Sequence, residues 1–430
     1  MSETLSRASR THFLDEGKMR VLFLAPQPFY QERGTPIAVK IALETLAKRL
    51  PRTECGETSI DVLCYAEGED INIPGVSIHR IPGPQCLRGI RPGISLKKLF
   101  CDALFFFAII SLVIKARKRQ YTIIHAVEES VFIAWFVKKL WGIPYIYDMD
   151  SSLSLQVTEK WWWSKPLYPI MNFLEGVAVR GSVAVAPVCD ALSAIATKHG
   201  SPHTVMLRDV SLLPLSSQQN HCRNQTLGLE LNNEQPVVLY VGNLEHYQGI
   251  DLLVEAFARV SDHESRPRLV VIGGTPESIE AYQRKAALLG CESTVNFLGP
   301  RPVSRLKDYL AAADIVVSPR VKGNNTPMKI YSYLHSGRAL LATDLATHRQ
   351  VLDEEISVLA PAEVFGFAEG LRTLLDSPEL RKTIGENAQR RAEALYTLSA
   401  FETQLTALYN EVRARVSVDR PQNVVAQEKA

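Results

Sequence analysis

The sequence predicts an α/β protein of two domains, each built on a parallel sheet, with the two sheets facing each other across a cleft. Three observations carry this prediction. The chain has 430 residues, more than a single hydrophobic core usually organises. Short apolar runs alternate with helical patterns in both halves. Each half also contains a strand–loop–helix unit with a Thr-Pro pair at the helix start, at Thr35 and at Thr326.

The first domain is expected over residues 19–215, after a polar tail at residues 1–18. It opens with a short run at residues 20–26, which has the β-branched and aromatic content of a buried strand. Further strands are expected at residues 60–65, 122–126, 144–148 and 183–186, and helices at 132–140 and 166–180. Alternating units of this kind build a parallel sheet that is covered on both faces.

A polar segment rich in Ser, Gln and Asn, residues 216–235, is expected to link the domains. The second domain, residues 236–395, repeats the alternation. Its strands are expected at residues 237–241, 268–272, 294–297, 315–318 and 339–343. Residues 396–416 are expected to form a helix that packs back on the first domain, and residues 417–430 a disordered tail.

Composition excludes several classes of protein. A net charge of +2 argues against a dedicated nucleic-acid binder, so no nucleic-acid partner is expected. The seven cysteines include no CxxC pair and read as reduced thiols without zinc spacing. The first eighteen residues are polar and charged, unlike a signal peptide. We therefore expect a cytoplasmic protein. The apolar segments described below also raise the option of peripheral contact with the inner face of the cell membrane.

The segment from Gly323 to Gly337 is the most informative part of the chain. Thr326 is expected to cap a helix, with Pro327 at its first position and Gly337 as its terminator. The start of a helix offers unpaired N–H groups and a positive dipole end, which suit phosphate or carboxylate, and Lys329 adds a charge. Plain capping is the alternative. In the first half, Gly34 before Thr35 would let the backbone approach a ligand closely.

Several ordered segments resemble family 4 glycosyltransferases of the GT-B architecture, which have two Rossmann-like domains. The resemblance covers roughly residues 20 to 415. The matching segments of the second half are residues 240–253, 271–274, 296–299, 312–319 and 323–343. The first half is similar at Gly34, in the strand ending at His125 and at residues 142–148.

The resemblance implies transfer of a sugar from a nucleotide sugar, with retention of configuration and without a metal or other cofactor. Backbone N–H groups and basic side chains would stabilise the diphosphate leaving group, and the two domains would position the substrates. The implied donor-binding residues are Gly34, Thr35, Asn243, Gln248, Gly274, Arg301, Asn325, Thr326, Pro327 and Ser332. The implied catalytic residues are Asp150, Lys329 and Asn324.

This chain departs from the family pattern, which indicates a variant subgroup. Asn324 and Ser332 occupy the positions of two glutamates that many members carry. Asn243 and Gln248 occupy those of an arginine and a lysine. Lys329, Arg301 and Arg320 are therefore the cations left for the donor.

In the first domain, Asp150 stands where a histidine is common in the family. Asp148 and Asp150 also match the short DxD pattern of metal-dependent glycosyltransferases. We favour a sugar or acceptor contact for Asp150 over metal binding, with a helix N-cap as the structural alternative. His125 is expected to be a structural histidine rather than a cleft residue.

Two segments bear on the acceptor. Residues 99–114 are apolar except for Asp102 and Ser111 and have basic flanks, so they form either a buried helix or a helix lying on a membrane surface. Trp161, Trp162 and Trp163 suit a membrane interface or sugar stacking. Together they favour a glycan or lipid-linked acceptor used in building cell-envelope polysaccharide.

The sequence thus predicts a glycosyltransferase whose partners are a nucleotide-sugar donor and a glycan or lipid-linked acceptor. Two alternatives remain open: a non-catalytic nucleotide- or sugar-binding protein of the same fold, and a nucleotide-sugar 2-epimerase. An NAD-dependent dehydrogenase is disfavoured because no GxGxxG follows a strand.

Overall fold

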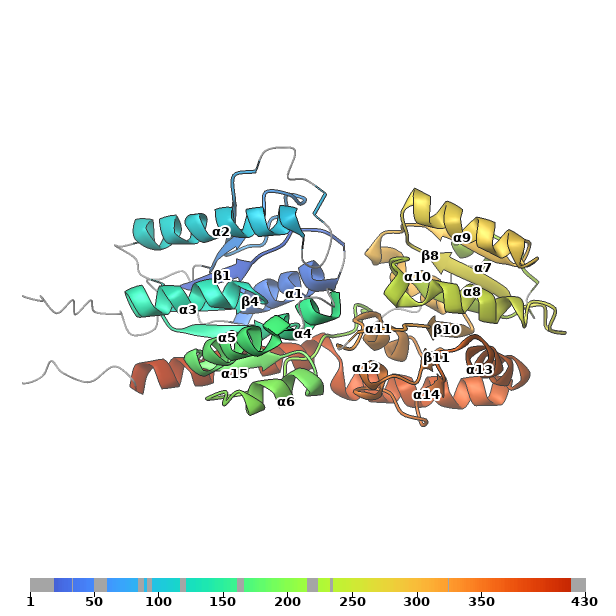
Figure 1. Ribbon diagram of the computed structural model, residues 1–430. Coiled ribbons are helices and arrows are strands. Elements are labelled where there is room, and N and C mark those ends of the chain that lie inside the picture. The colour runs from blue at the N-terminus through green and yellow to red at the C-terminus, as the bar shows by residue number, and fades with distance from the viewer. Residues whose placement is uncertain are drawn as a thin grey trace, which may run out of the picture.

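The computed structural model describes residues 19–32, 34–49, 60–83, 89–90, 95–116, 121–160, 166–214, 223–232, 235–323 and 325–418. Within these ranges the strands form two parallel six-stranded sheets, one in each domain. Figure 1 shows the two domains side by side, each with helices packed on its sheet. The predicted α/β fold class is confirmed. The predicted tail at residues 1–18, Trp161 to Trp163 and Asn324 lie outside the described residues.

The sheet of the first domain has the strand order β3-β2-β1-β4-β5-β6. Its strands are β1 (Val21–Ala25), β2 (Ile60–Cys64), β3 (Val76–Arg80), β4 (Ile123–Val127), β5 (Tyr145–Met149) and β6 (Ala184–Pro187). All neighbouring strands run parallel. The residues of β1, β2 and β4 are buried throughout, as expected for strands covered on both faces.

Two groups of helices cover this sheet. One face packs against α1 (Gly34–Arg49) and α15 (Leu398–Val418). The other face packs against α2 (Leu96–Lys115), α3 (Ser130–Trp141), α5 (Tyr168–Gly181) and α6 (Asp190–Lys198), with α4 (Leu153–Lys160) beside α5. No helix in the described ranges is long and apolar enough to cross a membrane.

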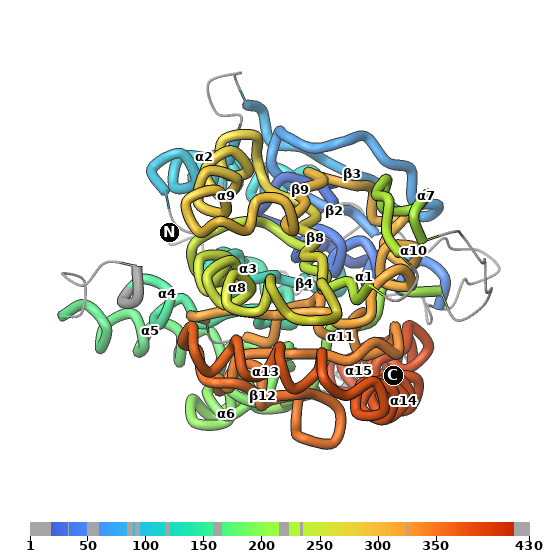
Figure 2. The backbone as a smooth tube through the Cα atoms, turned by 90° about the vertical axis from the view of Figure 1, so that its right-hand side faces the viewer, coloured from blue at the N-terminus to red at the C-terminus, as the bar shows by residue number. Residues whose placement is uncertain are grey.

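The last helix belongs to the core of the first domain. Leu405, Leu408, Tyr409 and Val412 of α15 are fully buried and join the apolar cluster around β1. Figure 2, seen from the second domain, places α15 behind α14, which is how the chain end returns to the first domain. α15 continues to Val418, so the first two residues of the predicted disordered tail are helical.

The sheet of the second domain has the order β12-β11-β10-β7-β8-β9. Its strands are β7 (Val237–Val241), β8 (Arg268–Ile272), β9 (Val295–Gly299), β10 (Ile315–Ser318), β11 (Ala339–Thr343) and β12 (Val358–Ala360). Its helices are α7 (Arg223–Leu227), α8 (Ile250–Ala258), α9 (Pro276–Leu288), α10 (Leu306–Ala311), α11 (Lys329–His335), α12 (Ala346–Arg349), α13 (Val364–Asp376) and α14 (Pro378–Leu395). α7 falls inside the predicted linker and buries Leu227 in this domain's core.

Candidate active site

Loops that follow the carboxyl ends of strands in both sheets meet at the junction between the domains. Glu32, after β1, accepts a 3.0 Å hydrogen bond through its Oε2 from the backbone N–H of Val303, which follows β9. Met328, after β10, packs against the apolar cluster of the first domain. Open α/β sheets bind ligands at this edge of their strands. The junction is therefore the candidate site.

Lys329 is the basic group at the centre of this junction. Its Nζ lies 3.1 Å from Oε1 of Gln248 and 4.0 Å from the ring centroid of Tyr240. Burial, followed by the charge of Arg320, lowers the pKa of Lys329 well below its ordinary value. A Cβ added at Gly242 would come within 2.7 Å of this Nζ, so the amine lies directly under the backbone at the end of β7. A buried amine without a carboxylate beside it favours an incoming anion.

The loop after β7 is organised around that lysine. Gln248 is 7% exposed and its side-chain oxygen accepts from Lys329. The Tyr240 hydroxyl donates to the backbone oxygen of Asn243 at 2.7 Å. Gly249 has φ of 74°, and a Cβ there would overlap the backbone oxygen of Pro319. Asn243 and Gln248, which stand where many family members carry an arginine and a lysine, are thus parts of a fixed loop.

Arg320 holds the loop that precedes α11. Its Nε donates to the backbone oxygen of Lys322 at 2.6 Å, and its Nη1 donates to that of Asn325 at 3.3 Å. The guanidinium also lies 5.4 Å from the ring centroid of Tyr247. Among the three cations expected to serve the donor, Arg320 is therefore engaged in shaping the loop.

The prediction that Thr326 caps the following helix is wrong. α11 begins at Lys329, and Met328, the residue before it, makes no side-chain cap. The Thr326 hydroxyl instead donates to the backbone oxygen of Thr347 at 3.1 Å, and Thr326 is 3% exposed. The loop bends toward α12 before the helix starts, so Pro327 precedes the helix as well. Asn324 falls in the same loop, outside the described residues.

Ser332 faces the connection between the domains. It is 1% exposed, and its hydroxyl oxygen accepts a 3.0 Å hydrogen bond from the backbone N–H of Leu212. The neighbouring Ser211 hydroxyl hydrogen-bonds with Nδ1 of His335 at 2.8 Å. The structure thus does not gather Ser332 with Lys329 and Gln248.

The remaining predicted donor residues lie around the junction edge. Gly34 and Thr35 start α1, and a Cβ at Gly34 would meet only open space. Gly274 follows β8 with φ of 90°, and a Cβ there would press against Leu244. Arg301 follows β9 and is exposed, with a 3.3 Å contact to the backbone oxygen of Pro300.

Four carboxyl groups gather at the carboxyl edge of the first sheet: Glu128 after β4, Asp148 in β5, Asp150 after β5, and Asp209 in the segment that leaves the domain. Burial, then neighbouring charges, raises the pKa of Glu128 to about 7. Burial and Asp148 raise the pKa of Asp209 to about 7. Burial, with Asp148, Glu128 and Asp209, raises the pKa of Asp150 well above its ordinary value. Protonated carboxyls can donate hydrogen bonds to sugar oxygens.

His125 connects this edge to α15. It is fully buried, with Nε2 3.1 Å from Oδ2 of Asp148 and Nδ1 2.9 Å from the Tyr409 hydroxyl. Its ring stacks on that of Phe23 at a centroid distance of 4.3 Å. All its polar atoms are satisfied within the fold, so its role is structural.

Sequence reasoning missed four residues of the junction: Glu128, Asp209, Tyr240 and Gly242. Glu128 and Gly242 each follow a strand end, which was an available signal. Asp209 lies in an irregular segment, and nothing in its neighbourhood marks it. Within the described ranges, no group of three His, Cys, Asp or Glu side chains is arranged to hold a metal ion.

The comparisons with known proteins bear on the family and the fold. The family described as glycosyl transferases group 1 matches residues 225–391. The D-inositol 3-phosphate glycosyltransferase of Corynebacterium glutamicum (strain R) is 26% identical over 319 residues, covering 71% of this chain and 76% of the relative. The alpha-D-kanosaminyltransferase of Streptomyces kanamyceticus is 24% identical over 291 residues, covering 66% of this chain and 74% of the relative.

Solved structures share the two-domain fold. Sucrose-phosphate synthase from Thermosynechococcus elongatus superposes with a TM-score of 0.73 at 19% identity, covering 93% of this chain and 100% of that chain. HepE of Anabaena, solved in complex with UDP-glucose, has a TM-score of 0.67 at 17% identity, covering 91% of this chain and 100% of that chain. The second domain thus resembles the group 1 glycosyl transferases, and the named relatives and the shared two-domain fold support a glycosyltransferase.

Proposed function

We propose that this protein transfers a sugar from a nucleoside diphosphate sugar to a glycan or lipid-linked acceptor, with Lys329 neutralising the diphosphate. The observation that carries the proposal is the position of Lys329, a part-buried amine under the Gly242 backbone that hydrogen-bonds to Gln248 and has no ion-pair partner among the described residues. Solved HepE holds UDP-glucose in the same fold, which supports a nucleotide-sugar donor here.

The chemical task is to stabilise a diphosphate whose negative charge grows as the sugar bond breaks. On this proposal an approaching diphosphate raises the pKa of Lys329 toward its ordinary value, and the attraction strengthens as charge develops in the transition state. Backbone N–H groups of the loop after β7 and of Gly34 and Thr35 supply hydrogen bonds from the two domains. We propose that this protein-based stabilisation replaces a metal ion and that configuration is retained. Gly274 and Arg301 contact the nucleoside, and Asn325 borders the sugar.

The first domain supplies the acceptor side. Burial and the neighbouring carboxylates raise the pKa of Asp150 well above its ordinary value, and burial and Asp148 raise that of Asp209 to about 7, so both groups keep their protons to a higher pH than in solvent. A protonated carboxyl beside the reacting sugar donates a hydrogen bond to a hydroxyl group without adding negative charge near the diphosphate. We assign this positioning task to Asp150, with Asp209 beside it.

The test replaces Lys329 by Met, which keeps the apolar contact with Tyr240, and by Ala. Purified proteins are incubated with membrane extract and labelled UDP-, GDP- and ADP-sugars. We expect kcat/KM to fall about 100-fold, because a charged hydrogen bond to the leaving group is worth roughly 3 kcal/mol. Lys329→Met should also unfold at higher denaturant concentration, since a desolvated amine without an ion-pair partner among the described residues is removed.

The matched control is Lys322→Ala, an exposed lysine of the same loop, which should leave transfer unchanged. Equal transfer by Lys329→Met and the wild-type protein would refute the phosphate role of Lys329. Nucleotide binding without transfer to any acceptor would favour the binding-protein alternative. Conversion of the donor sugar to its 2-epimer would favour the epimerase.

A further inference from the structure

The first domain exposes an unusual number of large apolar side chains along three neighbouring helices. Figure 1 shows α2, α3 and α5 lying along the same side of this domain, and all three pack on one face of its sheet. We call their outer surface the α2–α3–α5 face. Its exposed large apolar residues are Leu96, Leu99, Phe100, Phe107, Ile114, Phe136, Leu140, Trp141, Tyr168, Ile170, Phe173 and Leu174. Phe107 is 68% exposed and Phe173 is 63% exposed. A patch of this kind marks an interaction surface.

The charges on this face are all of one sign. The three helices contain two acidic residues, Asp102 and Glu175, and both are engaged inside the domain. The Tyr65 hydroxyl donates to Asp102, while Glu175, 1% exposed, accepts from Ser152 and Ser154. The exposed basic residues of the same helices are Lys97, Lys115, Lys139 and Arg180. Lys98 instead pairs with Glu129, and Lys138 donates to the backbone oxygen of Gly181. By contrast, α14 alternates acidic and basic residues, as solvated helices do.

An apolar face mixed with basic side chains and free of exposed acidic ones matches the surface of an anionic bilayer. Apolar side chains enter the boundary between headgroups and acyl chains, while lysines remain at the phosphates. A second copy of this chain is a poor occupant, because a two-fold contact would oppose lysines to lysines.

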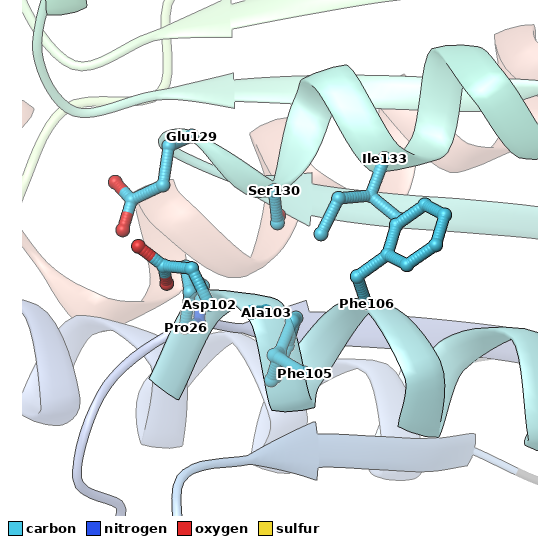
Figure 3. A pocket seen from close by; sticks show the side chains of 8 residues that line it. All are labelled: Pro26, Asp102, Ala103, Phe105, Phe106, Glu129, Ser130 and Ile133. Carbon is cyan, nitrogen blue, oxygen red and sulfur yellow. The ribbon is translucent and has the colours of Figure 1, made fainter. Parts of the chain in front are cut away.

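The face also contains a recess. A slot of about 300 Å³ lies between α2 and α3. Figure 3 shows Phe106 and Ile133 at its apolar end and Asp102 and Glu129 at its polar end. The ring of Phe106 lies 5.6 Å from those of Phe107 and Phe136, so the apolar lining continues onto the exposed face. The surface therefore has room for lipid chains as well as a flat apolar area.

The slot also fixes where the face lies relative to the candidate active site. Pro26, which follows β1, and Glu129, which follows β4, line the slot together with Asp102 of α2. The start of α2 is thus at the carboxyl edge of the sheet, where the junction lies. Leu96, Leu99 and Phe100 extend the apolar face to this edge.

We infer that the α2–α3–α5 face docks on an anionic lipid bilayer and places the interdomain junction at the membrane surface. The inference deepens the proposed function, because it gives a lipid-linked acceptor a route to the site. Docking itself, however, does not depend on turnover and is measured without it.

The experiment is co-sedimentation of the full chain with phosphatidylcholine vesicles, with or without phosphatidylglycerol. We expect binding to the anionic vesicles that weakens with added salt. The double variant Phe107→Glu/Phe173→Glu should lose at least tenfold in vesicle affinity. Lys139→Gln should lose about fivefold on anionic vesicles only. The matched control is Leu288→Glu/Phe365→Glu, which alters two equally exposed apolar residues of the second domain and should bind as the wild-type protein does.

Nucleotide-sugar binding and thermal unfolding of each variant show whether the fold is intact. A wild-type protein that ignores both kinds of vesicle, or a face variant that binds like the control, overturns the inference. So does a change from dimer to monomer in the face variant without vesicle binding, which would assign the face to a second copy. A face variant that no longer binds vesicles but still transfers sugar to a water-soluble acceptor supports docking and leaves the proposed function standing. Vesicle binding by a protein that transfers no sugar keeps the docking and refutes the proposed function.

Discussion

Asp209 shows at the scale of one residue how the junction suppresses an ionisation that would occur in solvent. Its carboxyl group has a pKa of about 7 because it is buried and lies near Asp148. The folded protein holds this proton to a higher pH than the unfolded chain does. The free energy of unfolding therefore falls as the pH rises from the unfolded pKa, near 3.8, to about 7.

Asp209→Asn should remove this decrease in the free energy of unfolding with rising pH. Between about pH 5 and about pH 8, the wild-type protein should lose on the order of 3 kcal/mol more stability than the variant. Urea unfolding at the two pH values measures the difference. Asp262→Asn, on an exposed side chain, is the control and should retain the wild-type pH dependence. Parallel curves for wild type and Asp209→Asn would show that Asp209 ionises normally.

The residues of the candidate site differ in how far the sequence could reveal them. Lys329 was identifiable, because a lysine in a polar loop before a helix is a local pattern. Its burial under Gly242 could not be predicted, because it depends on how α11 packs against β7. Val241 of β7 hydrogen-bonds to Tyr333 of α11, although the two residues are 92 positions apart in the chain. Asp209 gave no local signal at all. The prediction for Thr326 was wrong because its hydroxyl donates to the backbone oxygen of Thr347, a distant residue in the chain, and does not cap the adjacent helix.

At the scale of elements, the sequence located all the central strands and the edge strands β6 and β9. Each predicted strand run of the two sheets forms a strand, since buried parallel strands leave continuous apolar runs. β3 and β12 were missed. β3 is an edge strand whose Ser77, His79 and Arg80 interrupt the apolar pattern, and β12 has three residues.

The position of α15 makes the first domain discontinuous in sequence. Leu408 is fully buried in the cluster around β1, although it lies beyond the whole second domain. Leu408→Ala should destabilise the protein by about 2–5 kcal/mol, the cost of a cavity in a packed core. Leu398→Ala, at a 45%-exposed position of the same helix, should change stability by less than about 0.5 kcal/mol. Denaturant unfolding compares the two, and equal midpoints would mean that α15 is not part of the cooperative unit.

At the scale of the whole molecule, the chain crosses between the domains twice, and the crossings are bonded together. The backbone N–H of Ser211 donates to the backbone oxygen of Tyr396 at 3.0 Å, beside the contact of Leu212 with Ser332. Because the two crossing segments are bonded to each other, we expect the domains to move most easily by rotating about this connection. The hydrogen bond from the Val303 N–H to Glu32 connects loops of the two domains and limits this rotation.

Glu32→Ala should therefore loosen the junction. Its hydrogen bond to the Val303 N–H is exposed and worth about 1 kcal/mol, so a donor that needs the closed arrangement should bind roughly fivefold more weakly. Fluorescence energy transfer between labels on α1 and α9, measured without donor, should report a longer mean distance. Glu44→Ala removes an exposed carboxylate of α1 that forms an ion pair with Lys40, and should leave both readouts unchanged. If the interdomain distance stays the same while donor affinity falls, Glu32 acts on the donor directly and the closure argument fails.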